Sequence, residues 1–255
     1  MTIEQRYNLA KDSLNGRLFA PYQREGVLWM LTMEDQKSGP KGGFLCDEMG
    51  LGKTVQLVAT MLGNPKPRTL IIVPKSIITQ WVEEVTRFAP HLTISVFDGP
   101  KRRIEDADVT LAPYSLLSTH EKSPLHMVQW DRVVLDEAHE IRNKKSKLFK
   151  SVCRLHTQIK WIVTGTPVFN SMEDFVSLCT FLGLSKVVVQ GMTSKIKDIY
   201  ILRRTKDDLA KINERLRLPP CHFENVELEM FPDEKQLYEI VFLEAQDTIR
   251  EAFRY

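Results

Sequence analysis

The chain has 255 residues, of which 43% are apolar, so it is long enough to bury a sizeable core. Its 35 basic and 33 acidic side chains leave a formal net charge of +2, which excludes the strong overall positive field of many polyanion-binding proteins. The four cysteines form no CxxC pair, which argues against a zinc site and a disulfide framework and favours a reducing compartment.

Short apolar runs alternate with helical patterns along most of the chain. The strand candidates are residues 42–46, 69–74, 93–99, 108–114, 131–137 and 160–167. Apolar residues at helical spacing lie between them, at 55–62, 78–85 and 175–182. Several strand candidates are continuous β-branched runs, which are typical of strands buried on both faces. The alternation predicts an α/β fold with a mainly parallel sheet and helices on both of its faces.

The residues after the first predicted strand form a glycine-rich pattern. They read Asp47-Glu48-Met49-Gly50-Leu51-Gly52-Lys53-Thr54 and match G-x-x-x-x-G-K-[ST], except that Asp replaces the first Gly. In that pattern, backbone N–H groups surround a phosphate, the lysine contacts the terminal phosphates, and the hydroxyl binds magnesium. The helix predicted to start at Thr54 favours an anion at its N-terminus. A glycine-rich turn that binds nothing remains the alternative at this point.

An acidic pair follows the predicted strand at 131–137. Asp136 would lie at the carboxyl edge of the sheet, where ligands of open α/β sheets bind. This position predicts a magnesium ligand, with Glu137 placed to orient or deprotonate the hydrolytic water. The alternative is a solvated strand end, which the order of this pair after "GKT" disfavours.

The stretches "DEMGLGKT", "DEAH" and "TGTP", in this order, resemble the helicase-like ATPases of superfamily two, and within it the Swi/Snf family of DNA-translocating chromatin remodellers. Four more stretches support the resemblance: "LFAPYQREGVLWM", "IIVPKSIITQWVEEV", "TGTPVFNSMEDFVSLCTFL" and "ILRRTKDDL". The compact form also resembles viral members, the global transactivators of insect baculoviruses. The resemblance implies a RecA-like three-layer α/β/α lobe of the P-loop NTPase type.

The family's nucleotide residues carry over by position. Gln23 would read the adenine edge, and residues 47–54 would hold ATP, with Lys53 on the phosphates. Thr54 and Asp136 would bind Mg²⁺. The residues that would couple this site to the DNA-contacting surface are His139, Thr164, Gly165 and Thr166. Without the family, Gln23 would more readily be read as an exposed polar residue on a helix.

The family's contacts to double-stranded DNA also carry over, and they go mostly to phosphates. They fall on Lys75, Ser76, Tyr114, Ser115 and Asn170. The alternatives are that the lysine is merely solvated and that Tyr114 packs in the core. The basic runs at 101–103 and 144–150 are further candidates for DNA or nuclear-import patches, although most such runs are solvated faces.

The sequence departs from the family in three respects. The stretch at 183–200 is shorter than the family's helical protrusion, Phe169 and Arg142 replace a glutamine and a lysine, and the second lobe has no counterpart. We therefore expect an ATP-binding lobe at 1–215, and at 216–255 a connector and a helix leading towards an absent second lobe. An arginine finger, such as that lobe supplies, is worth about 10³ to 10⁵ in rate, so the isolated lobe is expected to bind ATP with little hydrolysis.

The leading hypothesis is a DNA-dependent ATPase and double-stranded DNA translocase that acts on chromatin or in transcription regulation. Its location would be the nucleus, or the host nucleus for a viral protein, and no signal peptide or long apolar run indicates a membrane. The alternative is a non-enzymatic DNA- or protein-binding regulatory module. A small-molecule phosphotransferase is weaker, since it leaves "TGTP" and "PYQREG" unexplained.

Overall fold

The computed structural model describes the chain except for residues 17, 19–20, 119–122, 166–170, 212–221 and 253–255. The chain divides into two compact units, Met1–Arg217 and Leu218–Tyr255. The predicted boundary between residues 215 and 216 lies outside the described residues. None of the helices in the described part is long and apolar enough to cross a membrane.

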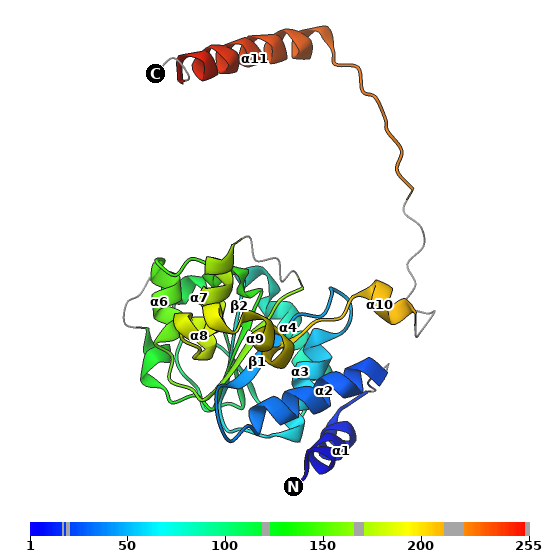
Figure 1. Ribbon diagram of the computed structural model, residues 1–255, viewed down its shortest axis with the longest axis vertical. Helices are drawn as coiled ribbons and strands as arrows, with labels where there is room; N and C mark the ends of the chain where they lie inside the picture. Colours follow the sequence, from blue (N-terminus) through cyan, green and yellow to red (C-terminus); the bar gives the residue numbers. More distant parts are fainter. Residues whose placement is uncertain (17, 19–20, 119–122, 166–170, 212–221, 253–255) are drawn as a thin grey trace. The chain divides into compact units, whose positions relative to one another are not determined.

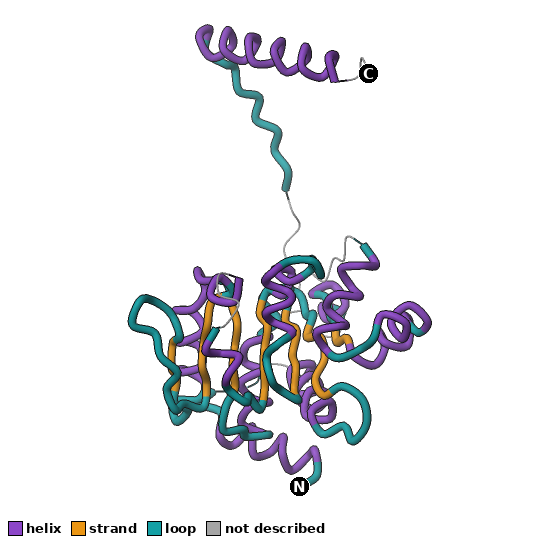
Figure 2. Tube along the Cα trace, turned by 90° about the vertical axis from the view of Figure 1, so that its left-hand side faces the viewer, coloured by secondary structure: helices purple, strands orange, loops and turns teal. Residues whose placement is uncertain are grey.

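The first unit contains a sheet of seven parallel strands, seen side by side in Figure 2. Their order is β3-β4-β2-β5-β6-β1-β7. The strands are β1 (Lys41–Leu45), β2 (Thr69–Val73), β3 (Ile94–Val96), β4 (Val109–Pro113), β5 (Arg132–Asp136), β6 (Ile159–Val163) and β7 (Ile201–Leu202). Every residue of β2 is buried, which explains its continuous apolar run, since helices cover both faces of the sheet. A strand is present in each of the six predicted ranges. β3 is shorter than the predicted 93–99, and residues 166–167 of the last range lie outside the described residues. β7 is an addition.

Two groups of helices flank the sheet, with α6, α7 and α8 on one side of it and α1, α2 and α3 on the other in Figure 1. The first group is α1 (Ile3–Ser13), α2 (Pro21–Glu34), α3 (Lys53–Gly63) and α4 (Ile78–Phe88), in which α3 contacts the other three. The second group is α5 (Ser115–Ser118), α6 (Lys147–Cys153), α7 (Met172–Leu182), α8 (Lys186–Gly191) and α9 (Thr193–Tyr200). Shorter elements are α10 (Lys206–Ala210) and the 3-10 helices η1 (Lys75–Ile77), η2 (Pro124–Met127) and η3 (Ala138–Ile141). The predicted α/β class is confirmed.

A buried ion pair joins several elements at the amino-terminal edge of the sheet. Arg132, the first residue of β5, donates from Nε and Nη2 to the two carboxylate oxygens of Glu34, each at 2.6 Å. The same carboxylate accepts from Trp161 Nε1 at 2.8 Å and from Asn64 Nδ2 at 2.6 Å. Arg132 also donates to the Asn64 carbonyl at 2.9 Å and to Thr69 Oγ1 at 3.2 Å. The pair is thus satisfied by hydrogen bonds from α2, β2, β6 and the end of α3.

The second unit contains one described helix, α11 (Pro232–Ala252). A helix is expected within residues 216–255, and α11 lies there; residues 253–255 lie outside the described part of the chain. Its apolar residues Leu237, Ile240 and Val241 are exposed.

Candidate nucleotide-binding site

The glycine-rich loop and the acidic pair meet at the carboxyl edge of the sheet. β1 and β5 both pair with β6 in parallel, so the residues that follow them emerge at the same edge. A cleft of about 670 Å³ opens there. Its lining comes from the loop, from α4 and η1, and from the ends of β5 and β6: Met49, Gly50, Gly52, Lys53, Thr54, Pro74, Ser76, Ile77, Gln80, Trp81, Glu84, Asp136, Glu137 and Val163. The fold thus brings together the two patterns that predict a nucleotide site.

The phosphate loop, residues 46–52, turns sharply at two glycines. Gly50 has a φ of 86° and Gly52 a φ of 76°, values that side chains other than glycine rarely adopt. Lys53 begins α3, and its Nζ donates to the carbonyl of Asp47 at 2.9 Å and to that of Glu48 at 3.5 Å. The ammonium group is therefore held across the loop at a helix N-terminus, where an anion is favoured.

Asp136 and Glu137 form a strained turn at the end of β5. Asp136 Oδ2 accepts from Trp81 Nε1 at 2.7 Å, and Oδ1 accepts from the Glu137 amide at 3.0 Å. Burial raises the pKa of the Asp136 carboxyl, and the Trp81 hydrogen bond opposes this rise. Glu137 is the only described residue besides glycines with a positive φ, 49°, a conformation that costs on the order of 1–3 kcal/mol. The surrounding structure therefore holds the backbone of Glu137 in this conformation.

Two aromatic residues support this turn, and sequence reasoning missed both roles. Trp81 looked like one apolar residue of a helix, but its indole N–H holds the Asp136 carboxylate. Tyr114 is buried, and its hydroxyl donates to the Asp136 carbonyl at 2.8 Å. Burial raises the pKa of Tyr114 well above its ordinary value. A buried tryptophan or tyrosine needs a partner for its polar atom, which was the signal available in the sequence.

The residues predicted to contact DNA lie in different environments. Lys75 and Ser76 are exposed in η1, after β2, and Ser115 is exposed at the start of α5. Lys75 Nζ lies 3.0 Å from the Asp98 carboxylate, and its hydrogen bond holds the pKa of Asp98 below the usual range. The Tyr114 side chain packs in the core, which is the alternative to a DNA contact that the sequence left open. Asn170 lies outside the described residues, and DNA contacts at all five positions stay predictions.

The residues predicted to couple the nucleotide site to DNA lie near the acidic pair or near the phosphate loop. His139 Nδ1 lies 3.3 Å from Glu137 Oε2. Thr164 is buried after β6, and its amide donates to the Leu45 carbonyl at 3.2 Å. A Cβ atom on Gly165 would lie 3.3 Å from Lys53 Nζ, so this glycine passes close to the phosphate loop. Thr166 lies outside the described residues.

Neither Gln23 of α2 nor Asp47 of the phosphate loop lines the cleft. Gln23 is buried on α2, and its Nε2 donates to the Leu51 carbonyl at 3.2 Å. The Asp47 carboxylate accepts from Arg204 Nε at 2.9 Å and from Gln56 Nε2 at 3.1 Å. The residue that departs from the glycine pattern therefore forms a buried ion pair, with an arginine that sequence reasoning did not single out. Adenine reading by Gln23 and a direct ATP contact of Asp47 stay predictions.

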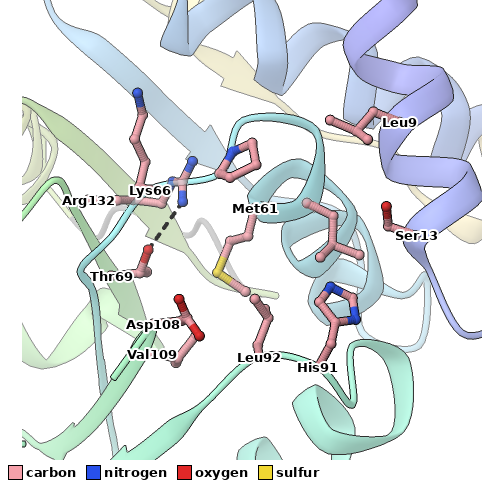
Figure 3. A pocket seen from close by; sticks show the side chains of 12 residues that line it. Leu9, Ser13, Met61, Lys66, Thr69, His91, Leu92, Asp108, Val109 and Arg132 are labelled. Atoms are coloured by element: carbon pink, nitrogen blue, oxygen red, sulfur yellow. Dashed lines mark hydrogen bonds between the residues drawn. The ribbon is translucent and has the colours of Figure 1, made fainter. Parts of the chain in front are cut away.

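A second, smaller cavity of about 190 Å³ lies at the opposite edge of the sheet. Its walls include Thr69, Val109 and Arg132, the first residues of β2, β4 and β5. Figure 3 shows them beside the apolar side chains of Met61 and Leu92. None of the residues predicted to bind the nucleotide lines this cavity. The cleft at the carboxyl edge is therefore the candidate site.

The chain is similar to a known protein family and to individual proteins. The family described as SNF2-related domain matches residues 22–191. The chain is 34% identical over 198 residues to the ISWI chromatin-remodeling complex ATPase ISW1 of Saccharomyces cerevisiae, which covers 71% of this chain and 17% of that protein. It is 29% identical over 241 residues to a protein of Orgyia pseudotsugata multicapsid polyhedrosis virus described as a "Probable global transactivator", covering 85% of this chain and 47% of the viral one.

A solved structure matches as well. The Sulfolobus solfataricus SWI2/SNF2 ATPase core in complex with dsDNA has a TM-score of 0.66 and 34% identity, covering 79% of this chain and 47% of that one. The chain thus spans less than half of the length of each of these three proteins.

Proposed function

The chain belongs to the SNF2-related family, and from this premise we propose that its first unit is the ATP-binding lobe of a DNA-dependent ATPase that moves along double-stranded DNA. The predicted resemblance to Swi/Snf ATPases, a baculovirus transactivator included, and the RecA-like fold are confirmed. The proposal rests on one observation: Lys53 and Asp136, from separate motifs, line one cleft, and Gly165, from a third motif, passes close to Lys53.

The proposed substrate is ATP, with its phosphates in the loop at 46–52. The Lys53 ammonium group is bonded to neutral backbone carbonyls. With a phosphate oxygen both partners of the bond carry charge, whereas with a carbonyl only the lysine does, so the lysine would exchange these carbonyls for the nucleotide. Gly165 of the "TGT" segment passes close to Lys53, so this segment would respond to phosphates bound there.

The donors at the cleft fit magnesium. Thr54 and Asp136, which both line it, offer a hydroxyl and a carboxylate oxygen. Mg²⁺ takes oxygen ligands and is usually bound through one or two carboxylates plus substrate phosphates. When bound, it would neutralise charge on those phosphates.

Glu137 is proposed to orient or deprotonate the water that attacks the terminal phosphate. Its carboxylate borders the cleft, and the Asp136 carbonyl beside it is held by Tyr114. His139, 3.3 Å from Glu137, would relay its position to the DNA-contacting surface. We propose that a second lobe supplies the arginine that completes hydrolysis, so this chain alone hydrolyses ATP slowly.

Double-stranded DNA is the proposed partner, and the nucleus the proposed location, in a host cell if the protein is viral. The exposed residues Lys75, Ser76 and Ser115 are suited to phosphate contacts. Support comes from the Sulfolobus relative, whose structure contains dsDNA, and from the yeast relative, which belongs to a chromatin-remodeling complex. A role in chromatin remodelling or transcription regulation follows as part of the proposal.

The test is steady-state ATP hydrolysis by this chain and by a longer natural form, each with and without duplex DNA. We expect DNA to stimulate the longer form, and Lys53→Ala and Glu137→Gln to reduce the stimulated rate by roughly 10²- to 10⁴-fold. Lys11→Ala, at an exposed lysine of α1, is the matched control and should leave the rate unchanged. Equal turnover in all variants would contradict the proposal, while DNA binding without any ATPase stimulation would favour the non-enzymatic module.

A further inference from the structure

The segment 201–211 lies against the phosphate loop, and we call it the bracket. It comprises β7, the turn at 203–205 and α10. Backbone amides of the loop donate to it: Cys46 N to the Leu202 carbonyl at 2.7 Å, and Glu48 N to the Arg204 carbonyl at 2.9 Å. In return, Lys206 N donates to Glu48 Oε2 at 2.7 Å. Cys46 and Glu48 of the loop are thus bonded to the bracket at residues 202, 204 and 206.

Arg204 is the centre of these contacts. Its Nε donates to Asp47 Oδ1 at 2.9 Å, and its Nη2 donates to Asp47 Oδ2 and, at 2.8 Å, to Gln56 Oε1. Its Nη1 donates to the Tyr22 carbonyl, and its guanidinium lies 5.1 Å from the centre of the Tyr22 ring. The Asp47 side chain is fully buried and the Arg204 side chain is 13% exposed. One guanidinium therefore joins the loop, α2 and α3.

Apolar packing and a glycine complete the arrangement. Leu51, which is fully buried in the loop, forms a small cluster with Tyr22 and Leu209 of α10. A Cβ atom on Gly26 would lie 1.9 Å from Gln56 Oε1 and 2.8 Å from Arg204 Nη2. Gly26 therefore leaves room for the guanidinium to pass beside α2.

We propose that Arg204 is a positioning residue for nucleotide binding, acting on Lys53 through Asp47. Arg204 holds the Asp47 carboxylate, and the carbonyl of the same Asp47 holds Lys53 Nζ at 2.9 Å. Release of the carboxylate would therefore shift the anchor of the lysine that is proposed to contact the phosphates. Because binding effects are reciprocal, ATP in the loop would also tighten the bracket. The inference rests on the proposed ATP site and adds to it a residue about 150 positions downstream of the loop.

The first experiment compares Arg204→Met and Arg204→Lys with Arg203→Met, an exposed arginine one position away. For each protein, the Kd for a fluorescent ATP analogue with Mg²⁺ and the melting temperature without nucleotide are measured. We expect Arg204→Met to raise Kd by roughly 10- to 100-fold, the loss that corresponds to one hydrogen bond to a charged group, and Arg203→Met to leave it unchanged. Arg204→Lys should lie between them, because it keeps the charge and loses the planar fork.

A purely structural Arg204 would give a different result. The Arg204 variants would then melt at lower temperature, and their folded fraction would bind the analogue with the wild-type Kd, which would overturn the proposal. If Arg204→Met does not fold, the Kd and melting temperature of Arg204→Lys are compared with those of Arg203→Met instead.

Amide hydrogen exchange separates failure of this inference from failure of the proposed function. Without nucleotide, Arg204→Lys should speed exchange at Glu48, and Arg203→Lys should not. In the wild type, ATP should slow exchange in the bracket. A wild-type chain that binds no ATP would refute the proposed function, whereas unchanged exchange at Glu48 in Arg204→Lys would refute the role of Arg204.

Discussion

The two edges of the sheet each contain an arginine paired with a fully buried carboxylate, but the two pairs position different parts of the protein. At the amino-terminal edge, Arg132 and Glu34 are bonded to each other and to groups of β2, β6 and the residue after α3. At the carboxyl edge, Arg204 and Asp47 fix a loop whose own carbonyl binds Lys53. The same kind of ion pair therefore joins elements of the fold at one edge, and at the other edge it is bonded to a residue that also binds Lys53 of the candidate site.

The comparison also shows why burial of an ion pair does not by itself reveal its role. Removing one partner of such a pair typically costs about 3–5 kcal/mol, because the other charge stays buried without compensation. Both arginines therefore contribute to stability. What distinguishes them is what the carboxylate residue also binds. The Asp47 carbonyl accepts from Lys53, which lines the cleft, whereas Glu34, the partner of Arg132, does not line the cleft.

The largest effect is expected for Arg132→Met, which should lower the free energy of unfolding by about 3–5 kcal/mol because Glu34 loses its counter-charge. The ATP affinity of the folded fraction should stay at the wild-type value, unlike that of Arg204→Met. Urea unfolding gives the first quantity and titration with the ATP analogue the second. A loss of ATP affinity in Arg132→Met would remove the distinction between the two edges.

A smaller effect is expected for Gly26→Ala, which adds a methyl group beside Gln56 and Arg204. Overpacking of this kind costs about 1–3 kcal/mol, and we expect weaker ATP binding as well, because the guanidinium must move. Gly191→Ala is the matched control, since its Cβ would meet no atom within 4 Å and the residue ends α8. That control should change stability by at most about 1 kcal/mol and leave ATP binding unaltered.

The last prediction concerns another carboxylate, Asp136, which is partly buried and accepts a hydrogen bond from an indole N–H instead of a guanidinium. Trp81→Phe should lower stability at neutral pH by about 1–3 kcal/mol, since a hydrogen bond to a charged group is lost. Because the folded pKa of Asp136 is raised above its unfolded value, ionisation of this carboxyl costs stability as pH rises through the folded pKa. Loss of the indole should raise this pKa further.

The difference in stability between Trp81→Phe and wild type should therefore grow with pH through the acid range and shrink below the ordinary pKa of Asp. Urea unfolding over that range measures it. A difference independent of pH would mean that the cavity left by the smaller ring, and not the hydrogen bond, causes the loss.

The sequence predicted the cleft well because its parts obey local rules. The buried strands are continuous β-branched runs, and parallel strands end at one edge, so Lys53 and Asp136 had to come near each other. The two-residue β7 has no periodicity to detect, and the contact of Arg204 with Asp47 spans 157 positions, so neither could be predicted from local pattern. Tyr114 follows a strand end, where spacing alone does not distinguish a surface aromatic from one buried beneath the turn.

The Arg204–Asp47 pair has a consequence for how such chains vary in evolution. A glycine at position 47, as the general phosphate-loop pattern has, would leave the guanidinium of Arg204 buried without its carboxylate, and a neutral residue at 204 would strand the carboxylate. Single changes at either position therefore carry a penalty that a joint change avoids. In alignments of related chains, the columns of residues 47 and 204 are expected to covary, and a search pattern that requires glycine first would overlook loops of this type.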